Sequence, residues 1–330
     1  MKRRDFITFL GGAVAFGAWS RAARAQQPAL PAVGYLGSAS PDIWAGRLQA
    51  FRQGLSEAGF DEGRNVTIEY RWAENHYDRL PAMAADLVGR GVNVLVTPGS
   101  LPAALAAKAA TTTVPVVFET GADPVRAGLV PSLNRPGGNI TGITALSFQL
   151  SPKRLEVMHE LLPSAKVLAA LVNPSAPATS EPQTRDLQAA APTLGIELHV
   201  LNASSDHDLD AAFVTLRQLR AGGLVIVPDV FTNSASKELA ALALRHKVAA
   251  IFQTPAFTAA GGLMSYGGNL TETHHLAGVY AGRILKGEKP ADLPVIQGTK
   301  VELIINMKTA KALGITVPLT LLGRADEVIE

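Results

Sequence analysis

The sequence predicts an α/β protein with two doubly wound, parallel-sheet lobes joined by a multi-strand hinge. Short apolar strands alternate with amphipathic or Ala-rich helices, a pattern typical of parallel sheets covered by helices on both faces. The alternation restarts near residue 167, so that two similar halves follow one another. Further helix and strand patterns come after residue 269, although neither half needs them in sequence order. We expect these last elements to cross between the lobes and to form the hinge.

The first half is expected to contain four strands and three helices. The helix at 43–58 has apolar residues at helical spacing (Leu48, Phe51, Leu55), and Gly59 ends it. The strand patterns cover 32–36, 66–70, 92–96 and 114–118, and the helix patterns cover 43–58, 80–88 and 101–110. The Gly-rich segment 137–142 is interpreted as a turn because its glycines do not match a nucleotide-binding spacing.

The second half repeats this order. Its strand patterns cover 167–172, 197–201, 223–227 and 249–252, with helices at 184–194 and 209–219. A helix at 271–285, a strand at 301–305 and a helix at 308–313 follow. We therefore expect an N-terminal lobe of residues 30–148 plus about 270–300, and a C-terminal lobe of residues 149–269 plus about 301–330.

The N-terminus has the features of an export signal. Residues 1–25 combine a charged start, an apolar stretch from Phe6 to Trp19 and an A-x-A site, which predicts a signal peptide cleaved near Ala25. The apolar stretch is shorter than the ~20 residues of a membrane-spanning helix. Arg3 and Arg4 resemble the twin-arginine export motif, although paired arginines also occur in ordinary secretory signals. We expect a periplasmic protein.

Composition excludes several function classes. The chain of 330 residues has a formal net charge of +2, which becomes −2 without residues 1–25, so no basic surface for nucleic acid is expected. The absence of Cys excludes disulfides and a thiol nucleophile. No nucleotide-binding P-loop, H-E-x-x-H or G-x-S-x-G motif is present. We therefore expect no catalytic residue, no metal and no cofactor. His274 and His275 are not expected to bind a metal together, because adjacent residues of a helix point to different faces.

The cleft between two such lobes is the expected ligand site, because ligands of parallel sheets bind outside the carboxyl ends of the strands. The serine at the start of helix 101–110 would bind a carboxylate or cap the helix. The aspartate after strand 223–227 would receive an amine or hydroxyl, or cap the next turn. Aromatic residues near 257 and 266 would stack on a planar ligand or pack in the core. The expected ligand-binding residues are Ser38, Ser40, Ser100, Thr120, Asn173, Asp229, Phe257 and Tyr266.

Several segments resemble the ABC-transporter substrate-binding family that includes the tryptophan-binding receptors. The resemblance rests on residues 123–130, 134–142, 261–267, 284–294 and 306–314, in that order along the chain. It implies a type 1 periplasmic-binding fold, a small-molecule ligand and permease subunits in the inner membrane as partners. Pro255-Ala256 stands before Phe257 where many relatives carry a polar or charged pair. Because of this departure the expected ligand is not restricted to an amino acid: it is an amino acid or a small aromatic or carboxylate compound.

The leading interpretation is thus a monomeric solute receptor of an ABC importer. A periplasmic ligand sensor for a membrane receptor would have the same sequence features, and the genes beside this one would separate the two. A secreted hydrolase on a similar scaffold is the remaining alternative, since a fold alone does not decide function. The hydrolase would need a reactive constellation, which the sequence does not contain.

Overall fold

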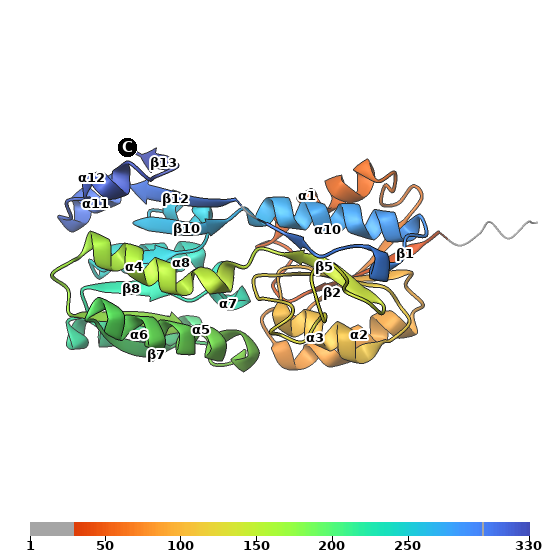
Figure 1. Cartoon of the computed structure of the whole chain (residues 1–330), viewed down its shortest axis with the longest axis horizontal. Helices are drawn as coiled ribbons and strands as arrows, with labels where there is room; N and C mark the ends of the chain where they lie inside the picture. Colours follow the sequence, from red (N-terminus) through yellow and green to blue (C-terminus); the bar gives the residue numbers. More distant parts are fainter. Residues whose placement is uncertain (1–29, 299) are drawn as a thin grey trace, which may run out of the picture.

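A computed structural model describes residues 30–298 and 300–330. Two lobes lie side by side along the long axis of the molecule (Figure 1), each built on one sheet with helices on both faces. The expected signal peptide of residues 1–25, with Arg3 and Arg4, lies outside the described residues. Within those residues, no helix is long and apolar enough to cross a membrane.

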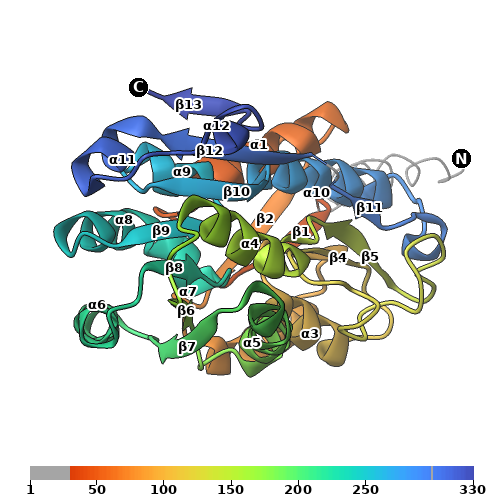
Figure 2. The same ribbon diagram turned by 60° about the vertical axis from the view of Figure 1, so that its left-hand side comes forward.

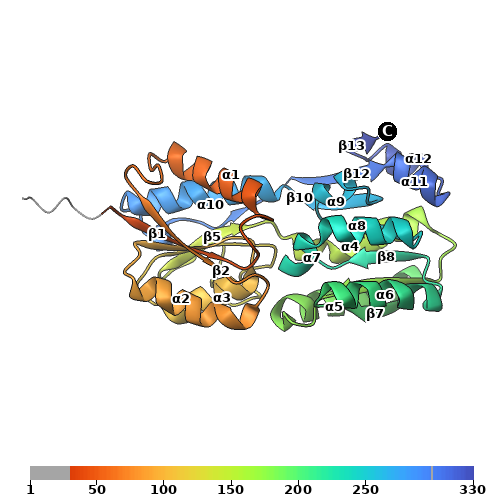
Figure 3. The ribbon, with the colours of Figure 1, turned by 180° about the vertical axis from the view of Figure 1, so that it is seen from behind.

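The N-terminal lobe has a six-stranded parallel sheet in the order β11-β5-β4-β3-β1-β2. Helices α1 and α10 cover one face, and α2 and α3 cover the other (Figure 3). The strands are β1 (Ala32–Gly37), β2 (Thr67–Trp72), β3 (Val94–Thr97), β4 (Val116–Thr120), β5 (Ile140–Thr144) and β11 (Ile296–Gln297). The helices are α1 (Ala45–Glu57), α2 (Leu80–Gly89), α3 (Leu101–Ala110) and α10 (Leu270–Leu285), with short 3-10 turns η1 (Tyr77–Arg79), η2 (Ser147–Leu150) and η4 (Pro290–Asp292).

The C-terminal lobe has a seven-stranded sheet in the order β13-β12-β10-β9-β8-β6-β7, parallel except for the antiparallel pair β10 and β12. Helices α4 and α5 pack on one face, and α6 and α8 on the other. The strands are β6 (Val167–Val172), β7 (Glu197–Asn202), β8 (Gly223–Ile226), β9 (Ala249–Phe252), β10 (Met264–Gly268), β12 (Val301–Asn306) and β13 (Glu327–Ile329). The helices are α4 (Ser151–Leu161), α5 (Pro177–Ala190), η3 (Ala191–Leu194), α6 (Asp206–Leu219), α7 (Val230–Ser234), α8 (Ser236–Arg245), α9 (Pro255–Ala259), α11 (Met307–Leu313) and α12 (Leu319–Leu322).

The chain crosses between the two sheets after β5, after β10 and after β11, and Figure 2 shows β10 and β12 extending toward α10 and β11. Arg154 of α4 ties two of these crossings together. Its guanidinium donates to the carbonyls of Ser147 at 3.0 Å and Tyr266 at 2.7 Å. Burial lowers the pKa of Arg154 to about 9. This arginine therefore fixes the geometry of the hinge through main-chain oxygens.

The expectation that residues 137–142 form a turn is wrong for the end of this segment. Ile140 begins strand β5, which lies between β11 and β4 in the sheet. Gly142 explains why the local sequence does not indicate a strand here. A Cβ at this position would lie 2.0 Å from the carbonyl oxygen of Phe118, so the glycine serves close strand packing. Helix α5 also begins earlier than expected, at Pro177 instead of residue 184. Proline is well accommodated in the first turn of a helix.

Candidate ligand-binding site

A cavity lies between the lobes, where the carboxyl ends of strands from both sheets face each other. Its volume is about 20 Å³, which is room for about one water molecule, because the lobes are in contact around it. Val230 of α7 packs across the gap against Trp44 and Ala39 of the N-terminal lobe. The cavity is lined by Arg47, Gly99, Ser100, Leu101, Pro102, Glu119, Gly121, Ser147, Phe148, Leu270 and His274 of one lobe and by Thr179, Asp229, Val230, Asn233 and Gln253 of the other.

Two of the expected serines meet at the N-terminal lobe's side of the cavity. The hydroxyl of Ser38, after β1, donates to the hydroxyl of Ser100 at 2.6 Å. Ser100 caps helix α3 by accepting from the main-chain N–H of Ala103 at 3.2 Å. Gly99 has a φ of +66°, and a Cβ there would lie 2.5 Å from the Trp44 ring. The glycine therefore lets the chain turn sharply and present the N-terminus of α3 to the cavity.

Asp229 connects the two lobes. Its Oδ1 accepts from Asn173 at 2.7 Å and from the N–H of Phe231 at 2.8 Å. The hydroxyl of Tyr77, from the opposite lobe, donates to Oδ1 at 2.9 Å and lies 3.1 Å from Oδ2. Burial raises the pKa of both Asp229 and Tyr77. This group of three side chains holds the lobes together, and we call Tyr77, Asn173 and Asp229 the latch.

Glu119, near the end of β4, is a buried acid with an incomplete set of partners. It is 1% exposed, and its Oε1 accepts from Thr273 at 3.1 Å. Its Oε2 has no hydrogen-bond partner within residues 30–298 and 300–330. Burial raises the pKa of Glu119 to about 7, although the charge of nearby Arg47 acts in the opposite direction. The carboxyl group therefore borders the cavity with unused acceptor capacity.

His274 of α10 lies beside Glu119 and is completely buried. Its Nδ1 is 2.7 Å from the carbonyl oxygen of Leu270, and because a carbonyl only accepts, this nitrogen carries the proton. Burial, followed by the charge of Arg47, lowers the pKa of His274 to about 3. The ring is thus neutral and Nε2 is a bare acceptor, which has no partner among the residues that the structure describes.

Three more polar side chains face the same cavity. Gln253 donates to Asn233 at 2.8 Å, while its Oε1 and the hydroxyl of Thr179 have no partner in the described part of the chain. Arg47 of α1 stacks over the Trp44 ring at 5.2 Å. No ion pair of its guanidinium occurs among the described residues. Buried polar atoms normally have partners in a folded protein, so this cluster indicates a place for a ligand or water.

Ser38 and Asn173 contact the lining residues Ser100 and Asp229 without lining the cavity themselves, and the other four expected residues also lie outside the lining. Ser40 accepts from the N–H of Trp44 through its main chain, and Thr120 accepts from the N–H of Ala122 in the turn after β4. Phe257 is fully buried and packs edge-on against Phe252, because its short helix turns inward. Tyr266 packs against the apolar core of the C-terminal lobe. Neither aromatic ring is therefore placed to stack on a ligand in this arrangement.

Sequence reasoning missed the residues that carry the free polar atoms. Glu119 stands within an apolar strand, where an unpaired charge is a signal of function. His274 shares the buried face of α10 with Ala277 and Ala281, at helical spacing. That position indicates a buried histidine. Gln253 and Thr179 are on segments whose approach to the cleft depends on how the lobes close.

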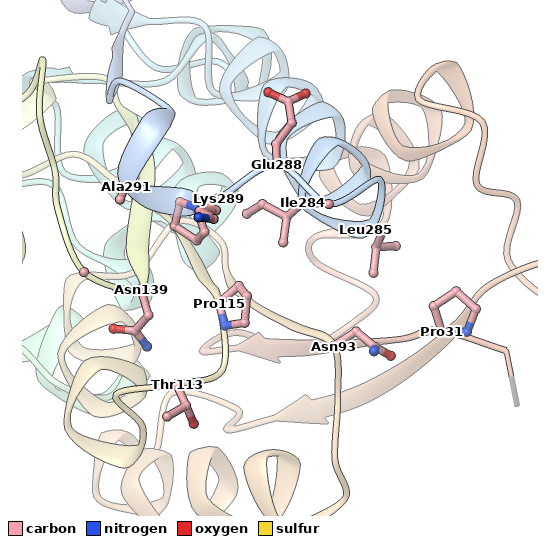
Figure 4. Close-up of a pocket in the computed structure, with 13 residues that line it drawn as sticks. Pro31, Asn93, Thr113, Pro115, Asn139, Ile284, Leu285, Glu288, Lys289 and Ala291 are labelled. Carbon is pink, nitrogen blue, oxygen red and sulfur yellow. The ribbon is translucent and has the colours of Figure 1, made fainter.

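A second hollow lies at the opposite end of the N-terminal lobe, at the amino ends of its strands (Figure 4). Its two asparagines are already used: Asn93 accepts from the N–H of Ala32 at 2.8 Å, and Asn139 donates to the carbonyl of Val114 at 2.7 Å. The cleft is therefore the better candidate site. No group of three His, Cys, Asp or Glu side chains arranged for a metal is found within the described ranges.

The two sheets, three crossings and interlobe cavity define a two-lobed solute receptor with the type 1 periplasmic-binding fold. The chain belongs to the family described as ABC transporter substrate binding protein, whose model matches residues 42–329. This is a family of binding proteins, not of enzymes.

Three similar proteins illustrate the family. A tyrosine-binding protein of Clostridioides difficile is 28% identical over 265 residues, which cover 80% of this chain and 75% of that protein. A solved structure of a conserved domain protein from Vibrio cholerae is 27% identical with a TM-score of 0.82, covering 90% of this chain and 99% of the other. An ABC domain from Streptococcus pneumoniae in complex with L-Trp is 26% identical with a TM-score of 0.79, covering 91% and 100%.

Proposed function

We propose that this protein is the extracytoplasmic solute receptor of an ABC importer, which captures a small ligand between its lobes and delivers it to permease subunits in the inner membrane. The observation that carries the proposal is the interlobe cavity, in which four buried side chains from both lobes have a polar atom without a partner in the described part of the chain: Glu119, Thr179, Gln253 and His274. Each such atom costs free energy while it stays unpaired. A ligand that supplies the missing hydrogen bonds therefore favours the closed arrangement of the lobes.

The ligand class that we propose is an amino acid or a small aromatic or carboxylate compound. The named relatives, which bind tyrosine or were solved with L-Trp, support this class. Phe148 is the aromatic side chain of the cavity lining and offers an apolar surface to such a ligand. The hydroxyl of Ser100 and the N-terminus of α3 offer hydrogen bonds to a carboxylate.

The location that we propose is the periplasm, after export through the twin-arginine pathway and cleavage near Ala25. Support comes from the family and from the sequence of residues 1–25. We also propose the lobe boundaries expected from the sequence, with crossings near residues 148, 269 and 300, because the two sheets divide the strands in the same way. We propose that the receptor acts as a monomer.

Calorimetric titration with the twenty amino acids, their deaminated acids and their decarboxylated amines tests the proposal. We expect saturable binding of at least one compound, with contraction of the molecule in small-angle scattering if the ligand-free lobes open in solution. The site variant carries Thr179→Val together with Gln253→Leu. The control is Thr193→Val on the outer surface. Absence of binding by every compound would contradict the proposed ligand class.

A further inference from the structure

The free polar atoms of the cavity are mainly acceptors. Nε2 of His274 is an acceptor because Nδ1 carries the ring proton. Oε2 of Glu119 is an acceptor when the acid is ionised, and Nδ1 of His274, 3.3 Å away, directs its proton to Leu270 instead. Both side chains are more than nine-tenths buried and line the same cavity. A ligand that satisfies this pair must bring hydrogen-bond donors.

The carboxylate of Asp229 is not a free acceptor for a ligand's hydrogen-bond donors in this arrangement. Its two oxygens already accept from Asn173, Phe231 and Tyr77, within the latch and the adjacent turn. A ligand amine at Asp229 would have to compete with the bond from Tyr77 that joins the lobes. Oε2 of Glu119 has no hydrogen-bond partner among the described residues, so a ligand amine would meet no such competition there.

Arg47, the cation of the cavity lining, belongs to the N-terminal lobe, as Glu119 and His274 do. Arg47 lines the cavity beside the N-terminus of α3, and its charge acts on both Glu119 and His274. No carboxylate lies within ion-pair distance of its guanidinium in residues 30–298 and 300–330. A guanidinium can bind a ligand carboxylate with two parallel hydrogen bonds. The lobe thus presents an unpaired cation and an unpaired acid to one space.

We propose that Glu119 and His274 form the subsite for a protonated amine, while Arg47 faces a carboxylate, so that the ligand is a small zwitterion. This inference rests on the proposed function and assigns the residues that set its specificity. Both charged subsites belong to the N-terminal lobe, which binds the ligand first. Gln253 and Thr179 then reach the ligand from the C-terminal lobe as the lobes close. Ionised Glu119 gains a cationic partner in place of the water lost on burial.

A different arrangement would also pair the charges. If the side chain of Arg47 turned toward Glu119, the two would neutralise each other and the ligand would need neither charge. Substitution of Glu119 distinguishes these cases. If Glu119 binds the ligand's amine, the substitution removes the partner of that amine; if Glu119 pairs with Arg47, the substitution frees the guanidinium. In the second case, Glu119→Gln would strengthen the binding of compounds that carry only a carboxylate.

The experiment uses matched compounds with the full mature chain: L-tyrosine, L-tryptophan and the other amino acids, each compared with its deaminated acid and its decarboxylated amine. Calorimetry should show that the parent protein prefers the amino acid over its deaminated acid by at least tenfold. Glu119→Gln should reduce that preference at least tenfold, and His274→Phe should reduce it in the same direction. The control is Glu57→Gln, because Glu57 forms a similar pair with His275 at 2.8 Å outside the cavity. Melting curves confirm that each variant is folded.

Three results overturn the inference. If the parent protein binds deaminated acids as tightly as amino acids, the amine subsite does not exist, although the proposed receptor function stands. If Glu119→Gln keeps the parent's preference, Glu119 is not the amine's partner. If none of the compounds binds to the parent protein, the proposed ligand class fails together with this inference.

Discussion

Substitution of Glu119 by Gln should change how the stability of the ligand-free protein depends on pH. Burial raises the pKa of this carboxyl to about 7, against an ordinary value of 4.5. The charged and polar groups around it are Arg47, Thr273, His274, Tyr35 and the main-chain N–H of Gly99, which lowers its pKa. Gln has the same shape and remains neutral, so it keeps the hydrogen bond from Thr273 and removes the titration.

The sign follows from proton binding. Between pH 4.5 and 7 the folded protein holds a proton on Glu119 that the unfolded chain has released, so the free energy of unfolding falls as the pH rises. Integration from pH 5 to pH 8 gives a loss of about 2–3 kcal/mol from this one group. In Glu119→Gln the loss is absent. The difference in stability between variant and parent should therefore grow by about 2–3 kcal/mol in favour of the variant.

Denaturant unfolding at pH 5, 6, 7 and 8 measures this difference, and the comparison cancels the titration of all groups that the two proteins share. His274, whose pKa burial lowers to about 3, contributes with the opposite sign in both proteins. Glu57→Gln at the exposed pair with His275 is the control and should show no comparable trend. A constant difference between Glu119→Gln and the parent from pH 5 to pH 8 would refute the raised pKa of a buried Glu119 carboxyl.

Three further predictions concern the latch, a glycine beside the cleft and the export signal. Tyr77→Phe removes the hydrogen bond to Asp229 across the lobes, which should weaken the closed state by about 1.5–3 kcal/mol. The radius of gyration of the ligand-free protein in small-angle scattering should then increase. An unchanged radius would argue against the latch. Gly99→Ala should lower the free energy of unfolding by about 2–4 kcal/mol, because it combines a positive φ with a clash against the Trp44 ring. Gly91→Ala, at a positive φ with free space around it, should lower it by about 1–2 kcal/mol. Equal costs would contradict the packing at Gly99. Joint replacement of Arg3 and Arg4 by Lys should stop export to the periplasm, measured by fractionation and immunoblotting, and unchanged export would indicate the general secretory route.

Much of the fold could be predicted because each lobe is built from local patterns. The apolar run at 167–172 and the helical spacing at 271–285 depend on neighbouring residues alone, and both elements lie within a residue of their expected bounds. The segment 137–142 depends on a tertiary contact instead. Its strand is stabilised by pairing with β4, and Gly142 is required by the carbonyl of Phe118, which no local pattern reveals.

The site was harder to predict for the same reason. The rule that ligands lie beyond the carboxyl ends of strands led to Ser100 and Asp229, both of which line the cavity. It led equally to Phe257, whose ring is buried in the core, and to Tyr266, whose ring is partly buried against the core. Whether a polar side chain is left without a partner depends on the whole packing. The free acceptor of Glu119 therefore became visible only in three dimensions.

The most direct test of this account is a crystal structure of the protein with the compound that binds best in calorimetry. We expect the ligand between the lobes, with its amine within hydrogen-bond distance of Glu119 Oε2 and its carboxylate at Arg47. A ligand seated between the lobes with its carboxylate toward Ser100 alone and its amine at Asp229 would contradict the proposed polarity of the site. A ligand bound in the hollow of Figure 4, with the cleft filled only by solvent, would contradict the central claim that the cleft is the receptor's binding site.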